Sequence, residues 1–169
     1  ISTVITFTAS TFLAIIAVWF TNLSGTGSEE AIFLLGDLAT SINLRGILLG
    51  GIIIGMLGVL DDITTSQAAA IDELHKANSS LTFSELYAHG VSIGKEHISS
   101  LVNTLALAYA GASLPLFILF SVNTSDPGWV IINSEFIAEE VVRTIVGSIA
   151  LILAVPITTF IACYYAKKY

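Results

Sequence analysis

The 169-residue sequence is poor in charge, in cysteine and in basic residues, and each shortage excludes something. Charged residues make up 11% of the chain, whereas a soluble domain usually carries about a quarter. An ordinary soluble fold is therefore excluded. The single cysteine, Cys163, excludes an internal disulfide and a cysteine-based metal cluster. The net charge of −7 argues against nucleic acid as a partner, because phosphate binding requires a basic surface.

In place of charge, the sequence has long uncharged runs. Hydrophobic residues make up 54% of the chain, and the mean hydropathy is +0.87. Three runs are long enough to cross the hydrocarbon core of a bilayer, which is about 30 Å thick. The fourth run, between Arg45 and Asp61, would cover only about 22 Å as a helix. We predict an all-α, polytopic bundle of transmembrane helices in a single domain over residues 1–169, with spans at about 1–23, 44–60, 98–122 and 144–166.

The distribution of lysine predicts how these spans are oriented. Lys76, Lys95 and the terminal Lys167 and Lys168 lie on one side of the predicted membrane, and Arg45 and Arg143 lie on the other side. Basic residues accumulate on the cytoplasmic side of membrane proteins. We therefore expect both ends of this segment in the cytoplasm. Because the chain opens inside an apolar segment, we also expect it to be part of a longer protein.

Two capping patterns predict amphipathic helices between the second and third spans. Thr64 and Gln67 fit a capping box, in which each side chain bonds to the backbone N–H of the other residue, and they predict an interfacial helix over about 65–77. Thr82 and Glu85 fit a second box, which predicts a helix over about 83–96 that continues into the third span.

The best candidate for a functional site is the pair Asp61 and Asp62, at the end of the undersized span. An ionisable group at membrane depth is costly and marks a functional site by default. Together with Thr64, Ser66 and Gln67, the pair supplies the oxygen ligands that hard cations prefer. Two neighbouring carboxylates also repel, so that one of them holds its proton more tightly. The alternative is that the two aspartates only mark the water-facing end of their helix.

A polar stripe in the third span is a second candidate. His97, Ser100 and Thr104 recur on one helix face, with Asn103 beside them, and could line a pathway. The alternative is hydrogen bonding between helices, which is common in membrane bundles. Glycine pairs in the second span, such as Gly46 and Gly50, predict close packing against another helix.

Near the fourth span, the sequence predicts a charge cluster of Glu139, Glu140 and Arg143. Glu139 and Arg143 have the spacing of a helical ion pair, and Glu29 or Glu30 could compete for the arginine. No zinc-protease or serine-hydrolase motif is present. We therefore expect no enzyme, no catalytic residue and no cofactor, and no particular metal is indicated. A membrane hydrolase would need a second polar cluster that converges on the aspartates.

Three segments resemble the YibE/F family of bacterial multi-pass membrane proteins: GIIIGMLGVLDDITTSQAAAIDEL, HISSLVNTLALAYAGASLPL and NSEFIAEEVVRTIVGSIALILAVPITT. The resemblance covers nearly the whole chain. It implies further spans upstream, a location in the bacterial cytoplasmic (inner) membrane and a transport role. It also implies importance for the matching positions, which are Asp61, Asp62, Thr64, Gln67, His97, Asn103, Thr104, Glu139, Glu140 and Arg143.

From these observations we expect transport of an ion or small solute, coupled to a proton or cation. Asp61 and Asp62 would bind the cation, Asn103 and Thr104 would line the route, and Arg143 would steady the acidic cluster. The expected partners are the lipid bilayer, the transported solute, and other transmembrane helices of the same protein or of a homo-oligomer. The alternative is a non-transporting membrane subunit that assembles or regulates another membrane complex.

Overall fold

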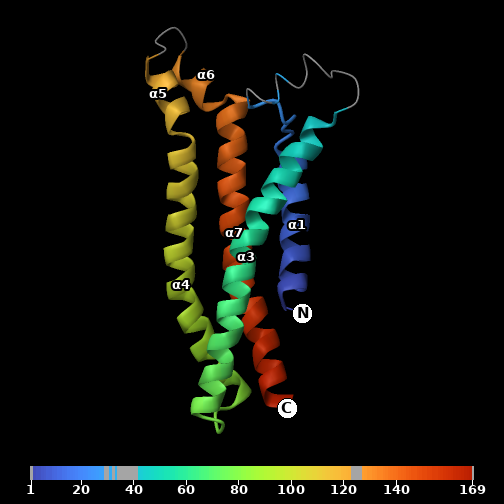
Figure 1. Ribbon diagram of the computed structural model, residues 1–169, viewed down its shortest axis with the longest axis vertical. Helices are drawn as coiled ribbons and strands as arrows, with labels where there is room; N and C mark the ends of the chain where they lie inside the picture. The colour runs from blue at the N-terminus through green and yellow to red at the C-terminus, as the bar shows by residue number, and fades with distance from the viewer. Residues whose placement is uncertain (1, 29–30, 32, 34–41, 123–126, 169) are drawn as a thin grey trace.

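The computed structural model describes residues 2–28, 31, 33, 42–122 and 127–168, and every regular element in these ranges is an α-helix. The all-α prediction is therefore confirmed. The elements, labelled in Figure 1, are α1 (Ser2–Phe20), α3 (Leu44–Ala77), α4 (Phe83–Ala112), α5 (Leu114–Val122), α6 (Gly128–Ile132) and α7 (Glu135–Lys168).

Helix α7 lies at the centre of the molecule, and α1, α3 and α4 all pack against it. Figure 1 shows that α3 and α7 run in the same direction, whereas α1 and α4 run the opposite way. Val146, Ala150 and Leu151 of α7 form a core with Ile52 of α3 and Ala14 of α1. Two of these five residues are alanines, whose small side chains allow the helix axes to approach closely, as membrane helices do when packing drives their association.

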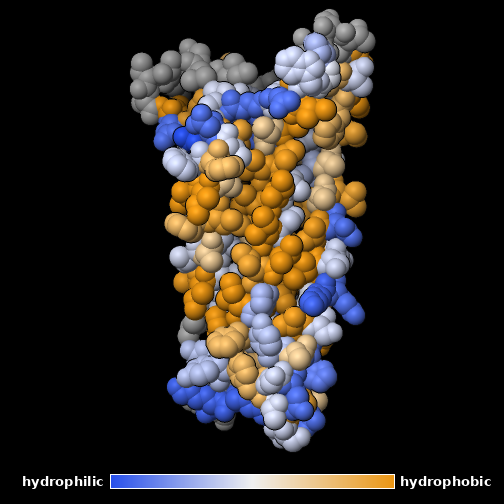
Figure 2. Space-filling view, turned by 180° about the vertical axis from the view of Figure 1, so that it is seen from behind, coloured by the Kyte–Doolittle hydropathy of each residue, from blue (hydrophilic) through white to orange (hydrophobic). Residues whose placement is uncertain are grey.

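Within the part of the chain that the structure describes, three helices are long and apolar enough to cross a membrane: α1, α3 and α7. Figure 2 shows apolar surface around the middle of the molecule and hydrophilic residues gathered at both ends. Large apolar side chains such as Phe20, Ile54 and Leu107 are 82%, 73% and 73% exposed. A surface of this kind is unfavourable in water and matches lipid. The chain is a membrane protein.

The predicted span over 98–122 is not one continuous helix and is not among these three. Helix α4 ends at Ala112, Ser113 forms a turn, and α5 begins at Leu114. Pro115 has no backbone N–H to continue the hydrogen-bond ladder of α4, and it fits the first turn of a new helix instead. By contrast, Pro156 lies inside α7, whose lower part leans away from its upper part in Figure 1.

The prediction of a separate interfacial helix over 65–77 was wrong. Helix α3 is continuous from Leu44 to Ala77, so the predicted span over 44–60 is only its first half. No glycine or proline interrupts the chain between Gly58 and Ala77, and a pair of aspartates on the exposed face does not break a helix. Thr64 and Gln67 do not cap a helix, because both are buried in the middle of α3.

The second half of α3 forms a three-helix extension with the first half of α4 and the end of α7. We call residues 64–77, 83–95 and 159–168 the lower extension. Its core contains Ile71, Leu86 and Cys163, all 0% exposed. Burying a side chain of the size of Ile71 or Leu86 stabilises a fold by about 1.5–3 kcal/mol where water is the alternative. The extension therefore has a small core of its own.

The predicted start of α4 is confirmed. Thr82 and Glu85 form a capping box, in which the backbone N–H of Thr82 donates to Glu85 Oε2 at 2.8 Å. The bonds from the backbone N–H and hydroxyl of Thr82 lower the pKa of Glu85, since both favour the ionised carboxylate. Helix α4 then passes through Gly90 and Gly94 without a break.

Close packing occurs at the glycines of α4 more than at those of α3. A Cβ at Gly90 would overlap Ile71 of α3, and a Cβ at Gly94 would overlap Val155 of α7. At Gly50, Gly51 and Gly58 of α3, a Cβ would meet nothing within 4 Å. At Gly55 a Cβ would lie 3.3 Å from the hydroxyl oxygen of Tyr109 in α4, so the predicted close packing is present there, whereas the other three positions are open within this chain.

Candidate functional site

The candidate residues on α3 divide between two faces of the helix. Asp61 and Asp62 are exposed, whereas Thr64 and Gln67 are only 1% and 2% exposed. Ser66 is half-buried and donates its hydroxyl proton to the carbonyl oxygen of Asp62 at 2.8 Å. Because side chains on opposite faces of a helix point away from each other, the structure does not bring these five residues together at one point.

The two buried members of this set connect α3 to three other helices. Thr64 Oγ1 lies 3.0 Å from Thr3 Oγ1 of α1. Gln67 Nε2 donates to the carbonyl oxygen of Gly90 in α4 and to Thr159 Oγ1 in α7, both at 2.8 Å. A buried amide whose N–H groups are hydrogen-bonded fixes the relative heights of the helices it joins. Thr64 and Gln67 thus hold the bundle in register.

The predicted polar stripe on α4 lies on the surface. His97, Ser100, Asn103 and Thr104 are all exposed. The hydroxyl of Thr104 donates to the carbonyl oxygen of Ser100, within the same helix, at 3.0 Å. The predicted stripe therefore does not face the interior of the described bundle.

The start of α7 holds a cluster of acidic residues against the segment that follows α1. Glu135 accepts hydrogen bonds from the hydroxyl of Ser24 at 2.7 Å and from the backbone N–H of Gly25 at 2.9 Å. Glu139 Oε1 accepts the backbone N–H of Gly27 at 2.9 Å. Gly25 has a φ of +83°, which a residue with a side chain rarely adopts. Residues 24–27 are thus folded around the two carboxylates.

The predicted pairing of Glu139 with Arg143 was wrong. Arg143 Nη2 lies 3.6 Å from Glu140 Oε1, three residues away, and Glu139 turns instead towards Gly27. The backbone N–H of Gly27 holds the Glu139 carboxylate, and Arg143 pairs with Glu140 instead. The competing candidates Glu29 and Glu30 lie outside the residues that the structure describes.

Glu139 is the most buried carboxylate of the cluster, at 6% exposure. It precedes the uncharged run that begins at Thr144, so it lies outside the predicted spanning segment. Burial raises the pKa of Glu139, and the hydrogen bond from Gly27 offsets only part of this effect. A carboxyl whose pKa is raised in this way is a candidate for binding and releasing a proton.

A cavity of about 150 Å³ lies beside this cluster, between α3, α7 and the segment after α1. Its lining includes Gly27, Ser28, Glu139, Glu140 and Arg143. The last three residues were predicted from the sequence, whereas Glu135 and the loop donors were not. The run Ser24-Gly25-Thr26-Gly27-Ser28, which is rich in small polar residues, was the signal that could have pointed to the loop.

The heights of the two acidic sites can be compared along α7. The contact between Gln67 and Thr159 sets the register of the two parallel helices, so Asp61 lies level with about Leu153. From there to Glu139 is about 14 residues of helix, or about 21 Å. The hydrocarbon core is about 30 Å thick. The two acidic sites are therefore closer together along α7 than the hydrocarbon core of an ordinary bilayer is thick.

Within the described residues, no group of three or more His, Cys, Asp or Glu side chains is placed to hold a metal ion.

A family model described as YibE/F-like protein matches residues 1–168. The chain belongs to this family. Searches of the curated proteins and of the solved structures find no match. Membership of the YibE/F-like family agrees with the membrane-spanning helices, and the resemblance seen in the sequence is confirmed.

Proposed function

We propose that this YibE/F-like protein is part of a transporter for an ion or small solute, coupled to a proton or cation. We place it in the bacterial inner membrane as a multi-pass protein, with both ends of this segment in the cytoplasm. The observation that carries the proposal is the separation of about 21 Å between the levels of Asp61 and Glu139. In a bilayer of ordinary thickness, at least one of these carboxylates lies within the hydrocarbon region unless the membrane thins around the protein.

The chemistry of the two sites supports coupling to protons or cations. Asp61 and Asp62 are adjacent and exposed. The backbone carbonyl oxygen of Asp62 accepts a hydrogen bond from the hydroxyl of Ser66. Near the start of α7, Glu139 is a buried carboxyl with a raised pKa beside a cavity. A carboxylate at the depth of the aspartate pair is retained in membrane proteins mainly for ion or proton movement. The exposed faces of α3 and α4 would be covered by other helices of a larger assembly.

The proposal predicts that ion flux depends on the aspartate pair. In proteoliposomes containing the full protein, a potassium diffusion potential should drive proton entry, which trapped pyranine reports. Replacing both Asp61 and Asp62 with asparagine should reduce this flux at least about tenfold, since an amide cannot carry the proton. Sodium and potassium fluxes should be followed in the same vesicles with entrapped indicators.

Asp72→Asn provides the matched control for this experiment. Asp72 is also an exposed aspartate of α3, but it lies in the lower extension and pairs with Lys76 at 2.6 Å. Its loss removes only a surface ion pair, so the flux should stay unchanged. An equal effect of the two substitutions, or wild-type vesicles as tight as protein-free ones to all three ions, would contradict a transport role.

A second candidate function is a non-transporting subunit that assembles or regulates another membrane complex. The observation that favours it is the exposure of Asp61, Asp62 and Asn103, which face outward instead of lining an interior chamber. Such outward polar groups suit contact with a partner helix. This function predicts a stoichiometric complex after mild detergent extraction, lost on Asn103→Leu, together with vesicles that carry no flux.

A further inference from the structure

A second cavity, of about 240 Å³, lies between α4, α5 and α7. Its walls are formed mainly by apolar side chains: Ala106, Ala110, Phe117, Val141 and Ile145. The two alanines leave room that larger residues would fill, and the break at Ser113 ends α4 where the cavity begins. This space is separate from the one beside Glu139.

One charged side chain lines this cavity: Glu140, which also lines the smaller cavity on its other side. Its partner Arg143 lies 3.6 Å away, which is too long for a hydrogen bond, and 28% of the arginine side chain is exposed. Two carboxylates, those of Glu139 and Glu140, lie near this guanidinium. The cluster therefore contains more carboxylates than guanidinium groups, and one of these carboxylates, Glu140, lies at the edge of an apolar cavity.

We propose that the cavity binds a small organic cation, an ammonium compound with an aromatic or alkyl arm. The arm would pack between the alanines of α4 and the branched side chains of α7, and the ammonium group would bind to Glu140. A volume of 240 Å³ corresponds to about eight waters of liquid at about 30 Å³ each. It suits a ligand of about eight to ten non-hydrogen atoms. This inference names the substrate class of the transporter and rests on the proposed function for the transport step, but its test needs no flux.

The test compares three probes of nearly equal shape on the full protein in lipid nanodiscs. These are 2-phenylethylammonium, the neutral 2-phenylethanol and the anion 3-phenylpropionate, with binding measured by saturation-transfer NMR. The cation should bind at least about tenfold more tightly than the alcohol, and the anion most weakly, as expected for a charge-assisted hydrogen bond. Equal binding of cation and alcohol would overturn the proposal and identify a crevice for lipid chains.

Two variants test the charge of Glu140 and the volume of the cavity separately. Glu140→Gln keeps the shape of the side chain and should abolish the preference for the cation. Ala110→Phe should fill the cavity and remove binding of both cation and alcohol. Its matched control is Ala108→Phe, because Ala108 is also an exposed alanine of α4 but does not line the cavity. Thermal unfolding of each variant checks that it remains folded.

The outcomes distinguish this inference from the proposed function. Binding of the cation by a protein that carries no flux would support the binding site and reject the transport function. Flux that depends on Asp61 and Asp62, without selective binding of the cation, would support transport and reject this substrate class. If Ala110→Phe binds the probes as well as the wild type does, the cavity is rejected as the binding site.

Discussion

At the scale of single residues, Gln67 shows how one buried amide can join three helices. Its Nε2 satisfies a carbonyl group of α4 and a hydroxyl group of α7, while Thr64, three residues earlier, contacts α1. The Gly90 carbonyl oxygen is also the acceptor of a backbone bond within its own helix, so the side chain adds a second bond. The position demands a long neutral side chain with two N–H groups, which few residue types provide.

Gln67→Ala should destabilise the protein by about 1–3 kcal/mol, because it removes two buried hydrogen bonds and leaves a void. Reversible denaturant unfolding of the purified protein in mild detergent measures this difference. Thr65→Ala is the matched control, since Thr65 is an exposed neighbour on the same helix. Similar midpoints for the two variants would show that the amide does not hold the helices together.

At the scale of the elements, glycine has opposite roles in α3 and α4. Gly90 is buried where α4 approaches Ile71, so its missing side chain permits close packing. Gly58 is exposed on α3 with open space around it, and it costs helix stability without gaining contact within this chain.

Alanine substitutions should therefore have opposite signs. Gly90→Ala should destabilise the protein by about 1–3 kcal/mol through overlap with Ile71. Gly58→Ala should stabilise it by about 0.5–1 kcal/mol through helix propensity. Both changes in stability are measured by denaturant unfolding of the purified variants in mild detergent. Destabilisation by Gly58→Ala would indicate instead that the open face of α3 is covered in the assembled protein.

The elements also show which parts of the structure the sequence could predict. The box at Thr82 and Glu85 was predictable because both partners lie within one turn of helix. The same pattern at Thr64 and Gln67 misled, because Thr3 and Thr159 lie far away in the sequence and compete for those side chains. Long-range partners cannot be read from a local pattern.

The candidate site follows the same rule. Glu139, Glu140 and Arg143 were identifiable as charges next to an apolar run, but their partners were not. Gly27 is 112 positions from Glu139, and only the fold brings its N–H to the carboxylate. The cavity beside Ala106 and Ala110 depends on the break at Ser113, which a run of apolar residues conceals.

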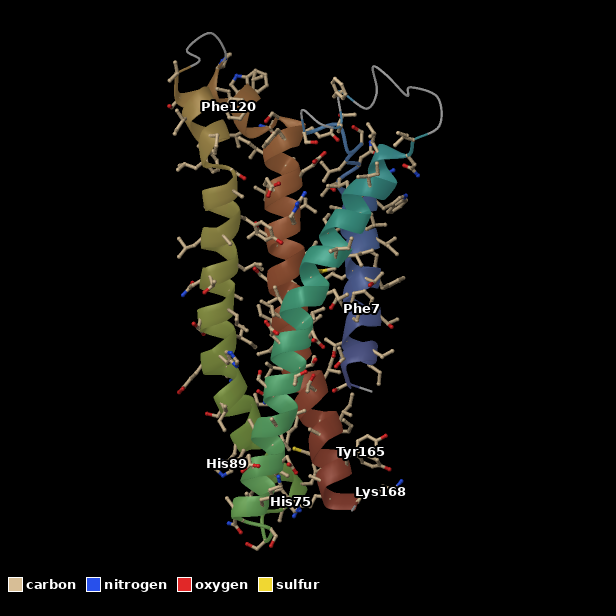
Figure 3. All side chains as sticks on the ribbon, viewed as in Figure 1. Phe7, His75, His89, Phe120, Tyr165 and Lys168 are labelled. Carbon is tan, nitrogen blue, oxygen red and sulfur yellow. The ribbon has the colours of Figure 1, made fainter. Side chains whose placement is uncertain are left out.

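At the scale of the whole molecule, the face seen in Figure 2 has a mostly apolar middle, which we call the apolar belt, between two polar ends. Figure 3 places His75 and His89 in the lower extension, together with Tyr165 and Lys168 near the end of α7. The cluster around Glu135 and the short helix α6 lie at the opposite end. The lower extension carries charged side chains such as Glu73 and Lys76, which pair with each other at 3.0 Å in an aqueous setting.

This arrangement predicts which positions can be labelled from each side of the membrane. In a Cys163→Ala background, a cysteine at Asn133 should react with an impermeant maleimide in intact spheroplasts. A cysteine at Ser79 should react only after the membrane is opened. Asn133 and Ser79 are both exposed and lie outside the apolar belt, so their intrinsic reactivity is comparable. Labelling of Ser79 alone in intact spheroplasts would reverse the orientation, and labelling of both positions would reject the span between them.

The continuity of α3 allows it to move as a single rod. Helix α3 has 34 residues and is about 51 Å long, so a change of tilt by about 5° displaces its far end by about 4 Å. A rigid rod transmits such a displacement without needing a hinge near Asp61. A partner bound to the lower extension would thereby be able to move the aspartate pair, which lies at the level of the lipid.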